Sequence, residues 1–219
     1  MQARHYSQLY RRLRDVNPRD YQRIIRMYEE KEQEIGRLDV LEHFELTVYY
    51  ADALFATGAY RQHAMMVDLV IEASMRHNIQ HVDGIEGDVF HHLLFKKAAS
   101  AFREQRYDEA AHVTKELIRM TPRRELHVRF LRAALFRQQA DVLQYGRAVF
   151  ICCLLVCAVL IFFDILLWRT TYPEFIPLCQ TAIAVTFTAG TVALASFYGF
   201  AYSRAHNKAY GFQRRSKNK

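Results

Sequence analysis

Histidines are the residues of this sequence that most directly suggest chemistry, because ten of them occur among 219 residues. His77 and His81 stand four residues apart, and His91 and His92 follow a short distance later. Carboxylates that could complete a zinc ligand set lie between them, at Asp83, Glu86 and Asp88. The segment HNIQHVDGIEGD nevertheless has the composition of a polar loop, in which histidines are solvated. We therefore expect no metal site, and no cofactor.

One arginine and one histidine have a more specific spacing. The segment RHNIQH, Arg76 to His81, resembles the R-x4-H signature of the all-helical HEPN ribonucleases. In that family the arginine and the histidine meet in a dimer cleft, and the histidine assists attack by the RNA 2′-hydroxyl. The resemblance implies that Arg76 and His81 would be the catalytic residues of a ribonuclease. The alternative interpretation is the end of a helix followed by a polar loop.

Other catalytic motifs are absent from the sequence. It contains no phosphate-binding glycine loop, no zinc-protease motif, no serine nucleophile elbow and no Cys-x-x-Cys. The four cysteines, Cys152, Cys153, Cys157 and Cys179, all lie in apolar runs, where they serve as small apolar side chains. We therefore predict a protein that binds rather than catalyses.

Two long apolar runs predict a membrane hairpin. Residues 148–168 contain a single charged side chain, Asp164, and residues 175–202 contain none. Because a hydrocarbon core about 30 Å thick needs roughly 20 helical residues, each run is long enough to cross a bilayer. The six-residue connection RTTYPE is too short to hold a domain.

The charge distribution predicts the orientation of this hairpin. Residues 1–147 carry a net charge of only +2, whereas residues 201–219 carry six basic side chains and no acidic one. The positive-inside rule therefore places both termini in the cytoplasm, at the inner or plasma membrane, and the connection outside. The basic tail is expected to attract anionic lipids. Nucleic acid is not an expected partner, because phosphate contacts dominate such binding and the N-terminal part is nearly neutral.

The segment before the hairpin reads as a series of helices, with almost no strand signal. Periodicity and helix-end signals predict two antiparallel pairs, 40–57 with 61–77 and 89–104 with 108–120. A last helix is expected to begin near Arg124 and to run unbroken into the first span, with Gly146 as a hinge.

These pairs resemble tetratricopeptide repeats over about residues 39–145. In residues 93–122 the family's large, small, tyrosine, alanine and proline positions are occupied by Leu94, Ala98, Tyr107, Ala110 and Pro122. The earlier pair matches through Ala51, Leu54, Gly58 and Tyr60, and Gln105 stands at the family's usual glycine. The fold class is therefore all-α. It comprises a helical-repeat domain (1–145), a transmembrane hairpin (146–202, spans 148–168 and 175–202) and a basic tail (203–219).

The resemblance favours a non-catalytic adaptor, anchored in the membrane, that binds a protein partner at the inner membrane face. Because aromatic and arginine side chains dominate binding energy, the candidate anchors on an exposed face are Tyr49, Tyr50, Arg103 and Arg106. One alternative is a two-span effector of the prokaryotic antiviral-defence type, which oligomerises and perturbs or permeabilises the membrane. The other is a membrane-tethered HEPN-like ribonuclease.

Small residues on the second span predict close helix packing. Ala182, Thr186, Gly190 and Ala193 recur every three or four residues and so share one face. This face could pack against the first span of the same hairpin, or join copies of the chain into a homo-oligomer.

Overall fold

The computed structural model describes residues 7–82, 84–85, 87–168 and 176–217 of the chain. Within these ranges every regular element is a helix and none is a strand, which confirms the all-α prediction. The elements are α1 (Gln8–Arg14), α2 (Tyr21–Glu30), α3 (Glu32–Ile35), α4 (Val40–Thr57), α5 (Tyr60–His77), α6 (Val89–Arg103), α7 (Tyr107–Met120), α8 (Glu125–Gln138), α9 (Ala140–Phe163), the π-helical turn η1 (Asp164–Trp168) and α11 (Ile176–Lys217).

The chain divides into two compact units, which are described separately. The N-terminal unit contains residues 1–134 together with 216–219, and the C-terminal unit contains residues 135–215. The division falls within α8, about one turn before that helix ends and Gln139 separates it from α9. The prediction that the last helix runs unbroken from near Arg124 into the first span is wrong, because α8 ends at Gln138 and α9 begins at Ala140; the predicted hinge residue, Gly146, lies inside α9.

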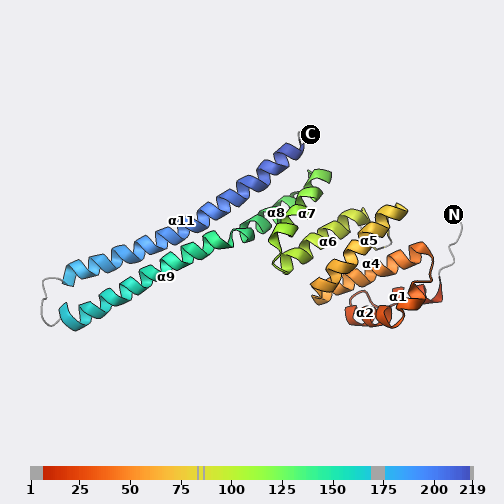
Figure 1. Ribbon diagram of the computed structural model, residues 1–219, viewed down its shortest axis with the longest axis horizontal. Coiled ribbons are helices and arrows are strands. Elements are labelled where there is room, and N and C mark those ends of the chain that lie inside the picture. Colours follow the sequence, from red (N-terminus) through yellow and green to blue (C-terminus); the bar gives the residue numbers. More distant parts are fainter. Residues whose placement is uncertain (1–6, 83, 86, 169–175, 218–219) are drawn as a thin grey trace. The chain divides into compact units, whose positions relative to one another are not determined.

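Four helices of the N-terminal unit form the two predicted antiparallel pairs, α4 with α5 and α6 with α7, and each helix packs on the next (Figure 1). Local signals set their ends. The Asp88 carboxylate caps α6 by accepting a 3.0 Å hydrogen bond from the Phe90 N–H. Gly58 ends α4 at a φ of 82°, a left-handed conformation that favours glycine.

Helices α1 and α2 cover one side of α4. The ring of Tyr28 on α2 stacks on Tyr50 of α4, with centroids 4.2 Å apart and planes 8° from parallel. The Tyr10 hydroxyl of α1 donates to the buried carboxylate of Glu45. The Ser7 N–H, just before α1, donates to Glu42 at 2.8 Å. These contacts enclose a core that the N-terminal segment helps to build.

The two helix pairs make several matching contacts at an offset of 47 residues. Phe55 contacts Tyr60 edge-on at 5.6 Å, and Phe102 contacts Tyr107 in the same way at 5.3 Å. The turn that Gly58 makes in the first pair is made in the second by Gln105, at a φ of 63°. Fully or almost fully buried positions also coincide, as Ala51 with Ala98, Leu54 with Ala101, His63 with Ala110, Val67 with Thr114 and Val70 with Leu117.

The buried face of α6 is broader than one line of residues. Leu94, which stands at the large position of the repeat motif, is only half-buried, as is Phe102, whereas the neighbouring Leu93 is fully buried. The reason is that α6 packs against both α5 and α7 and therefore buries residues on two sides. Ser100 faces His63 of α5, and the Ala101 carbonyl accepts from the Arg106 N–H at the start of α7.

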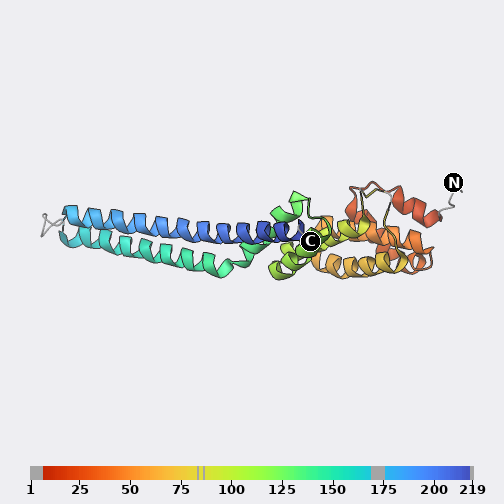
Figure 2. The same cartoon turned by 90° about the horizontal axis from the view of Figure 1, so that it is seen from above.

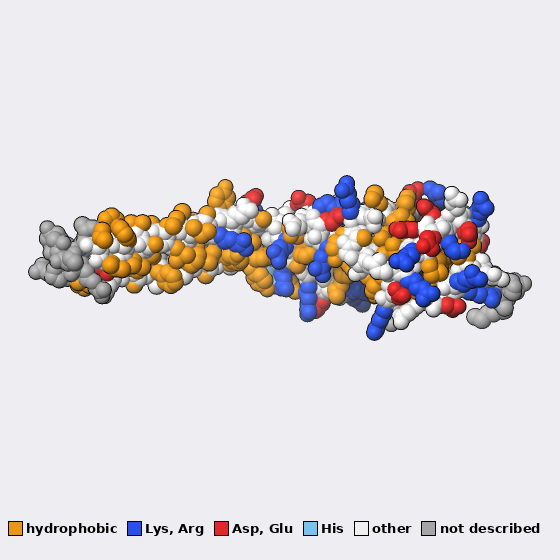
Figure 3. Space-filling model, turned by 90° about the horizontal axis from the view of Figure 1, so that it is seen from below, with side chains coloured by type: hydrophobic (Ala, Val, Ile, Leu, Met, Phe, Trp, Pro, Cys, Tyr) orange, Lys and Arg blue, Asp and Glu red, His pale blue; other side chains and the backbone are white. Residues whose placement is uncertain are grey.

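In the C-terminal unit, α9 and α11 lie side by side and antiparallel (Figures 1 and 2). Both are long and apolar enough to cross a bilayer, over Ala140–Leu166 and Ile176–Lys217. On the face drawn in Figure 3, hydrophobic side chains gather over the apolar parts of α9 and α11. Helix α11 extends beyond residue 202, the predicted end of the second span, and continues through the basic segment to Lys217.

The predicted small-residue face of α11 packs within this hairpin. Gly190 is buried, and a Cβ atom there would lie 2.9 Å from the Cβ of Cys153 on α9. Ala182, Thr186 and Ala193 on the same face are half-buried. Gly146 of α9 makes the reciprocal approach, since its Cβ would lie 2.9 Å from Phe197. Glycine therefore allows the two helices to approach closely at both levels.

Candidate partner-binding groove

The R-x4-H residues lie at the end of α5 and in the loop that follows. The Arg76 guanidinium is exposed and pairs with Glu72 one turn earlier, at 2.6 Å. The exposed ring of His81 places Nδ1 3.4 Å from the Gly87 carbonyl. The structure does not join Arg76 and His81 in one hydrogen-bonded pair.

The histidine-rich loop forms no metal centre in the part of the chain that the structure describes. There, no group of three or more His, Cys, Asp or Glu side chains is arranged to hold a metal ion. Asp83 and Glu86 lie outside the described residues. Asp88 instead caps α6 and contacts Nδ1 of His91 at 2.8 Å.

A serine–histidine pair that the sequence did not indicate lies in the core between α5 and α6. Ser100 Oγ is 2.5 Å from Nδ1 of His63, and neither residue is exposed. Burial, helped by the nearby charge of Lys96, lowers the pKa of His63 to about 4. Because no substrate can reach a fully enclosed hydroxyl, we interpret this pair as part of the packing of α5 on α6.

The four predicted anchor residues lie in different environments. Tyr50 does not lie on an exposed face: it is buried against Tyr28, and its hydroxyl donates to Glu29 at 3.1 Å. Tyr49 is half-buried, and a Cβ atom on Gly84 would lie 3.0 Å from its hydroxyl. Arg103 is exposed at the end of α6. Arg106 lines a groove.

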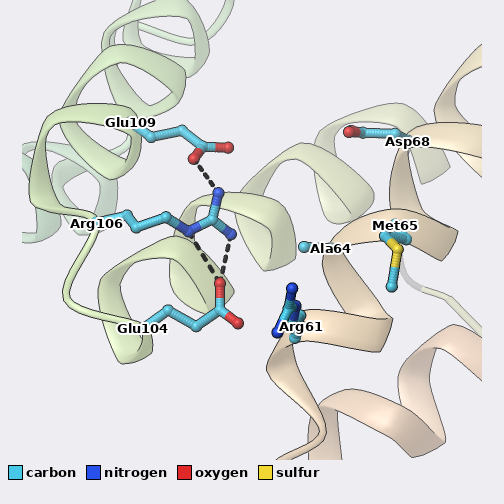
Figure 4. Close-up of a pocket in the computed structure, with 7 residues that line it drawn as sticks. All are labelled: Arg61, Ala64, Met65, Asp68, Glu104, Arg106 and Glu109. Carbon is cyan, nitrogen blue, oxygen red and sulfur yellow. Dashed lines mark hydrogen bonds and ion pairs between the residues drawn. The ribbon is translucent and has the colours of Figure 1, made fainter.

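That groove, the α5 groove, lies between the first half of α5 and the α6–α7 connection. It has a volume of about 680 Å³, and its lining residues are Arg61, Ala64, Met65, Asp68, Glu104, Arg106 and Glu109 (Figure 4). A second hollow of about 320 Å³ shares Arg61 and Glu104 and extends the groove over the α4–α5 turn. The surface is thus continuous along one end of both helix pairs.

Most charges in the α5 groove are neutralised within the protein. The Arg106 guanidinium lies between two carboxylates, at 2.9 Å from Glu104 through Nε and in contact with Glu109 (Figure 4). Asp68 pairs with Lys97 of α6 at 2.5 Å. Arg61 is exposed and forms no ion pair with any residue that the structure describes.

The apolar part of the groove is Met65, whose exposed fraction is 60%. One turn further along α5, Leu69 is also 60% exposed. This face was not among the predicted binding residues, although the sequence carries a signal for it. Helix α5 buries His63, Val67, Val70 and Ser74, so Met65 and Leu69 are apolar residues outside its core-facing line.

The groove can therefore hold an apolar side chain next to a carboxylate.

Comparison of the chain with models of known protein families, with curated proteins and with solved structures finds no match.

Proposed function

We propose that this protein is a membrane-anchored adaptor whose N-terminal unit binds a protein partner in the α5 groove without catalysing a reaction. One observation carries the proposal: Met65 is exposed beside Arg61, the groove cation that has no ion pair among the described residues. Exposed apolar and arginine side chains are typical of the centre of protein interfaces.

Charge complementarity defines the partner. Glu104 and Glu109 share the Arg106 guanidinium and Asp68 pairs with Lys97, so Arg61 is the groove cation left without an ion pair among the described residues. A partner segment that fits would place an acidic side chain against Arg61 and an apolar one against Met65. Such a pairing gives specificity through the charge and affinity through the apolar contact.

The repeated helix pairs support a tetratricopeptide-like scaffold for this function. Two pairs with the same turn geometry and the same buried positions stack into a surface that holds peptide segments, as helical-repeat proteins do. The α5 groove lies at the turns of both pairs, so it depends on their stacking.

The C-terminal hairpin would anchor this surface at the membrane. Two apolar helices and a basic flank support two spans with cytoplasmic termini and binding of anionic lipids by the flank. In a variant without native cysteines, a cysteine at Thr170 should react with an impermeant maleimide in intact cells, whereas one at Ser216 should not. The reverse labelling would contradict the orientation.

Photocrosslinking tests the partner proposal directly. A photoreactive amino acid in place of Met65 should crosslink one partner protein in cells, through a segment that contains an acidic and an apolar residue. The matched control is the same substitution at Met75, which lies on the same helix with an exposed fraction of 65% but outside the groove. Equal crosslinking from both positions would contradict a specific site.

Charge reversal then tests the role of Arg61. Arg61→Glu should weaken partner capture roughly tenfold or more, and changing the partner's acidic residue to lysine should restore it. Arg123→Glu, at an exposed arginine that does not line the groove, should leave capture unchanged. Crosslinks from position 65 only to a second copy of the chain, together with membrane leakage on expression, would favour the oligomerising effector instead. Loss of cellular activity in a folded His81→Ala variant would favour the ribonuclease.

A further inference from the structure

A second pocket lies at the opposite end of α6 from the α5 groove. It has a volume of about 310 Å³ and lies between the start of α6 and the connection from α7 to α8. Its lining includes Asp88, His91 and Phe95 on the α6 side, and Arg124 and Leu126 on the other side. This volume is at the small end of the range for ligand pockets, so it suits a molecule built on a single ring.

The ring of His91 is held as a hydrogen-bond acceptor. Asp88 Oδ1 caps α6 by accepting from the Phe90 N–H at 3.0 Å, and Asp88 Oδ2 lies 2.8 Å from Nδ1 of His91. Because a carboxylate only accepts, the neutral imidazole carries its proton on Nδ1 and a lone pair on Nε2. Nε2 is buried and has no hydrogen-bond partner among the described residues. Since buried polar atoms nearly always have a partner, this nitrogen marks a place for a donor.

The second imidazole of the pocket, His127, offers no donor either. It is 3% exposed, and its Nδ1 lies 3.2 Å from the hydroxyl of Thr121. That hydroxyl donates to the Leu117 carbonyl at 2.9 Å, so it accepts from the Nδ1–H of His127. Burial first, and then the nearby charge of Arg124, lower the pKa of His127 and so favour the neutral ring. The ring packs against Phe95, with centroids 5.7 Å apart.

These groups select a neutral donor rather than an ion. A ligand with an ammonium group would be repelled by Arg124, which is exposed and forms no ion pair with the described residues. A carboxylate or a phosphate would bring acceptor oxygens to the acceptor nitrogen of His91. A hydroxyl suits both groups, because its hydrogen can donate to Nε2 and its oxygen can accept from the guanidinium.

We propose that this pocket binds a small phenol. The hydroxyl would donate to Nε2 of His91, and the ring would contact Phe95 and Leu126, whose exposed fraction is 58%. A flat ring can pack on Phe95 edge-to-face or offset, as aromatic pairs prefer. The hydrogen bond from Nδ1 to Asp88 polarises the imidazole and strengthens Nε2 as an acceptor. The proposal is independent of the α5 groove, because it uses different residues at the other end of α6.

The test compares two probes that differ in one hydrogen-bond donor, 4-fluorophenol and 4-fluoroanisole. Fluorine NMR of each probe is recorded during titration with the full chain in an uncharged maltoside detergent. Micelles without protein give the baseline for partitioning of the probe into detergent. 4-Fluorophenol should bind saturably, and roughly tenfold or more tightly than 4-fluoroanisole, because the ether cannot donate and leaves Nε2 without a partner.

An exchange of aspartate for asparagine should remove the acceptor. In Asp88→Asn the amide oxygen can still accept from the Phe90 N–H, so the cap of α6 is kept. The amide NH₂ would donate to Nδ1 of His91, which moves the ring proton to Nε2 and turns that nitrogen into a donor. The preference for 4-fluorophenol over 4-fluoroanisole should then be lost. The matched control is Asp20→Asn at the exposed cap of α2, outside the pocket, where the preference should persist.

Leu126→Ala gives a second test that does not depend on the folding of Asp88→Asn, which a thermal melt checks. Because Leu126 is exposed, its truncation should leave folding intact, weaken the binding of both probes alike and preserve the preference between them. The proposal is overturned if 4-fluorophenol shows no saturable binding to the wild-type chain, or if the wild type binds both probes equally. It is also overturned if a folded Asp88→Asn variant keeps the preference, or if Leu126→Ala leaves the binding of both probes unchanged.

Discussion

Lowering the pH from 7 to 5 should destabilise the N-terminal unit through His63. Burial lowers the pKa of this imidazole to about 4, against 6.5 when it is solvated. Between these values the unfolded chain binds a proton that the folded chain does not, so the free energy of unfolding falls as the pH falls. The contribution is present in full above pH 6.5 and is lost progressively toward pH 4.

The size of the effect follows from the two pKa values. The difference between a pKa of 6.5 and one of about 4 corresponds to about 3 kcal/mol in total. Protonation equilibria with these pKa values give a loss of about 2 kcal/mol between pH 7 and pH 5. Asp52, whose pKa is lowered by His92 and Lys96 against the opposing effect of burial, titrates below this window.

The assay is urea unfolding of the full chain in maltoside micelles, followed by circular dichroism at 222 nm at pH 7 and pH 5. The control variant is His63→Gln, whose amide can still bond to Ser100 but does not titrate. His127, whose pKa is also lowered, is present in both proteins, so its contribution cancels in the difference. If the wild type and His63→Gln lose the same free energy between pH 7 and pH 5, the assignment to His63 is wrong.

Three further changes test the packing. Tyr10→Phe should cost about 1–3 kcal/mol of unfolding free energy in the same urea assay, because the buried Glu45 carboxylate loses its donor. Gln105→Gly should raise stability by up to about 1 kcal/mol, because glycine relieves the left-handed φ of 63°; a loss would contradict strain at this turn. Gly190→Leu should widen the spacing of α9 and α11, since even its Cβ would lie 2.9 Å from Cys153, and spin-label distances would measure the change.

The positions of the helices could be predicted because their ends are set by local chemistry. Asp88 caps α6 with its own side chain, and Gly58 adopts the left-handed conformation that ends α4. The break at Gln139, where the backbone has a φ of −87° and a ψ of 35°, could not be predicted, since that residue carries no breaker signal.

The candidate groove could be predicted only in part, because it is made by neighbours distant in sequence. Arg106 was identified from its residue type, but its two carboxylate partners reduce the charge it offers. Arg61 is a candidate contact residue because it has no such carboxylate partner among the described residues. The sequence alone does not show which charged side chains pair with one another. Tyr50 has the residue type of an interface anchor, yet the fold buries it against Tyr28, because α2 packs across α4.

The length of the hairpin supplies an argument for the membrane that hydropathy alone does not. Arg147 of α9 donates through Nε to the Tyr198 hydroxyl of α11 at 3.1 Å, so the two helices have their polar boundary at one level. From that level, about 22 residues of α11 lead back to Ile176, or about 33 Å at about 1.5 Å per residue. A hydrocarbon core is about 30 Å thick, so the distance from the boundary to the connection matches one bilayer. Helix α11 then continues to Lys217, so its basic residues belong to the same helix as the second apolar run.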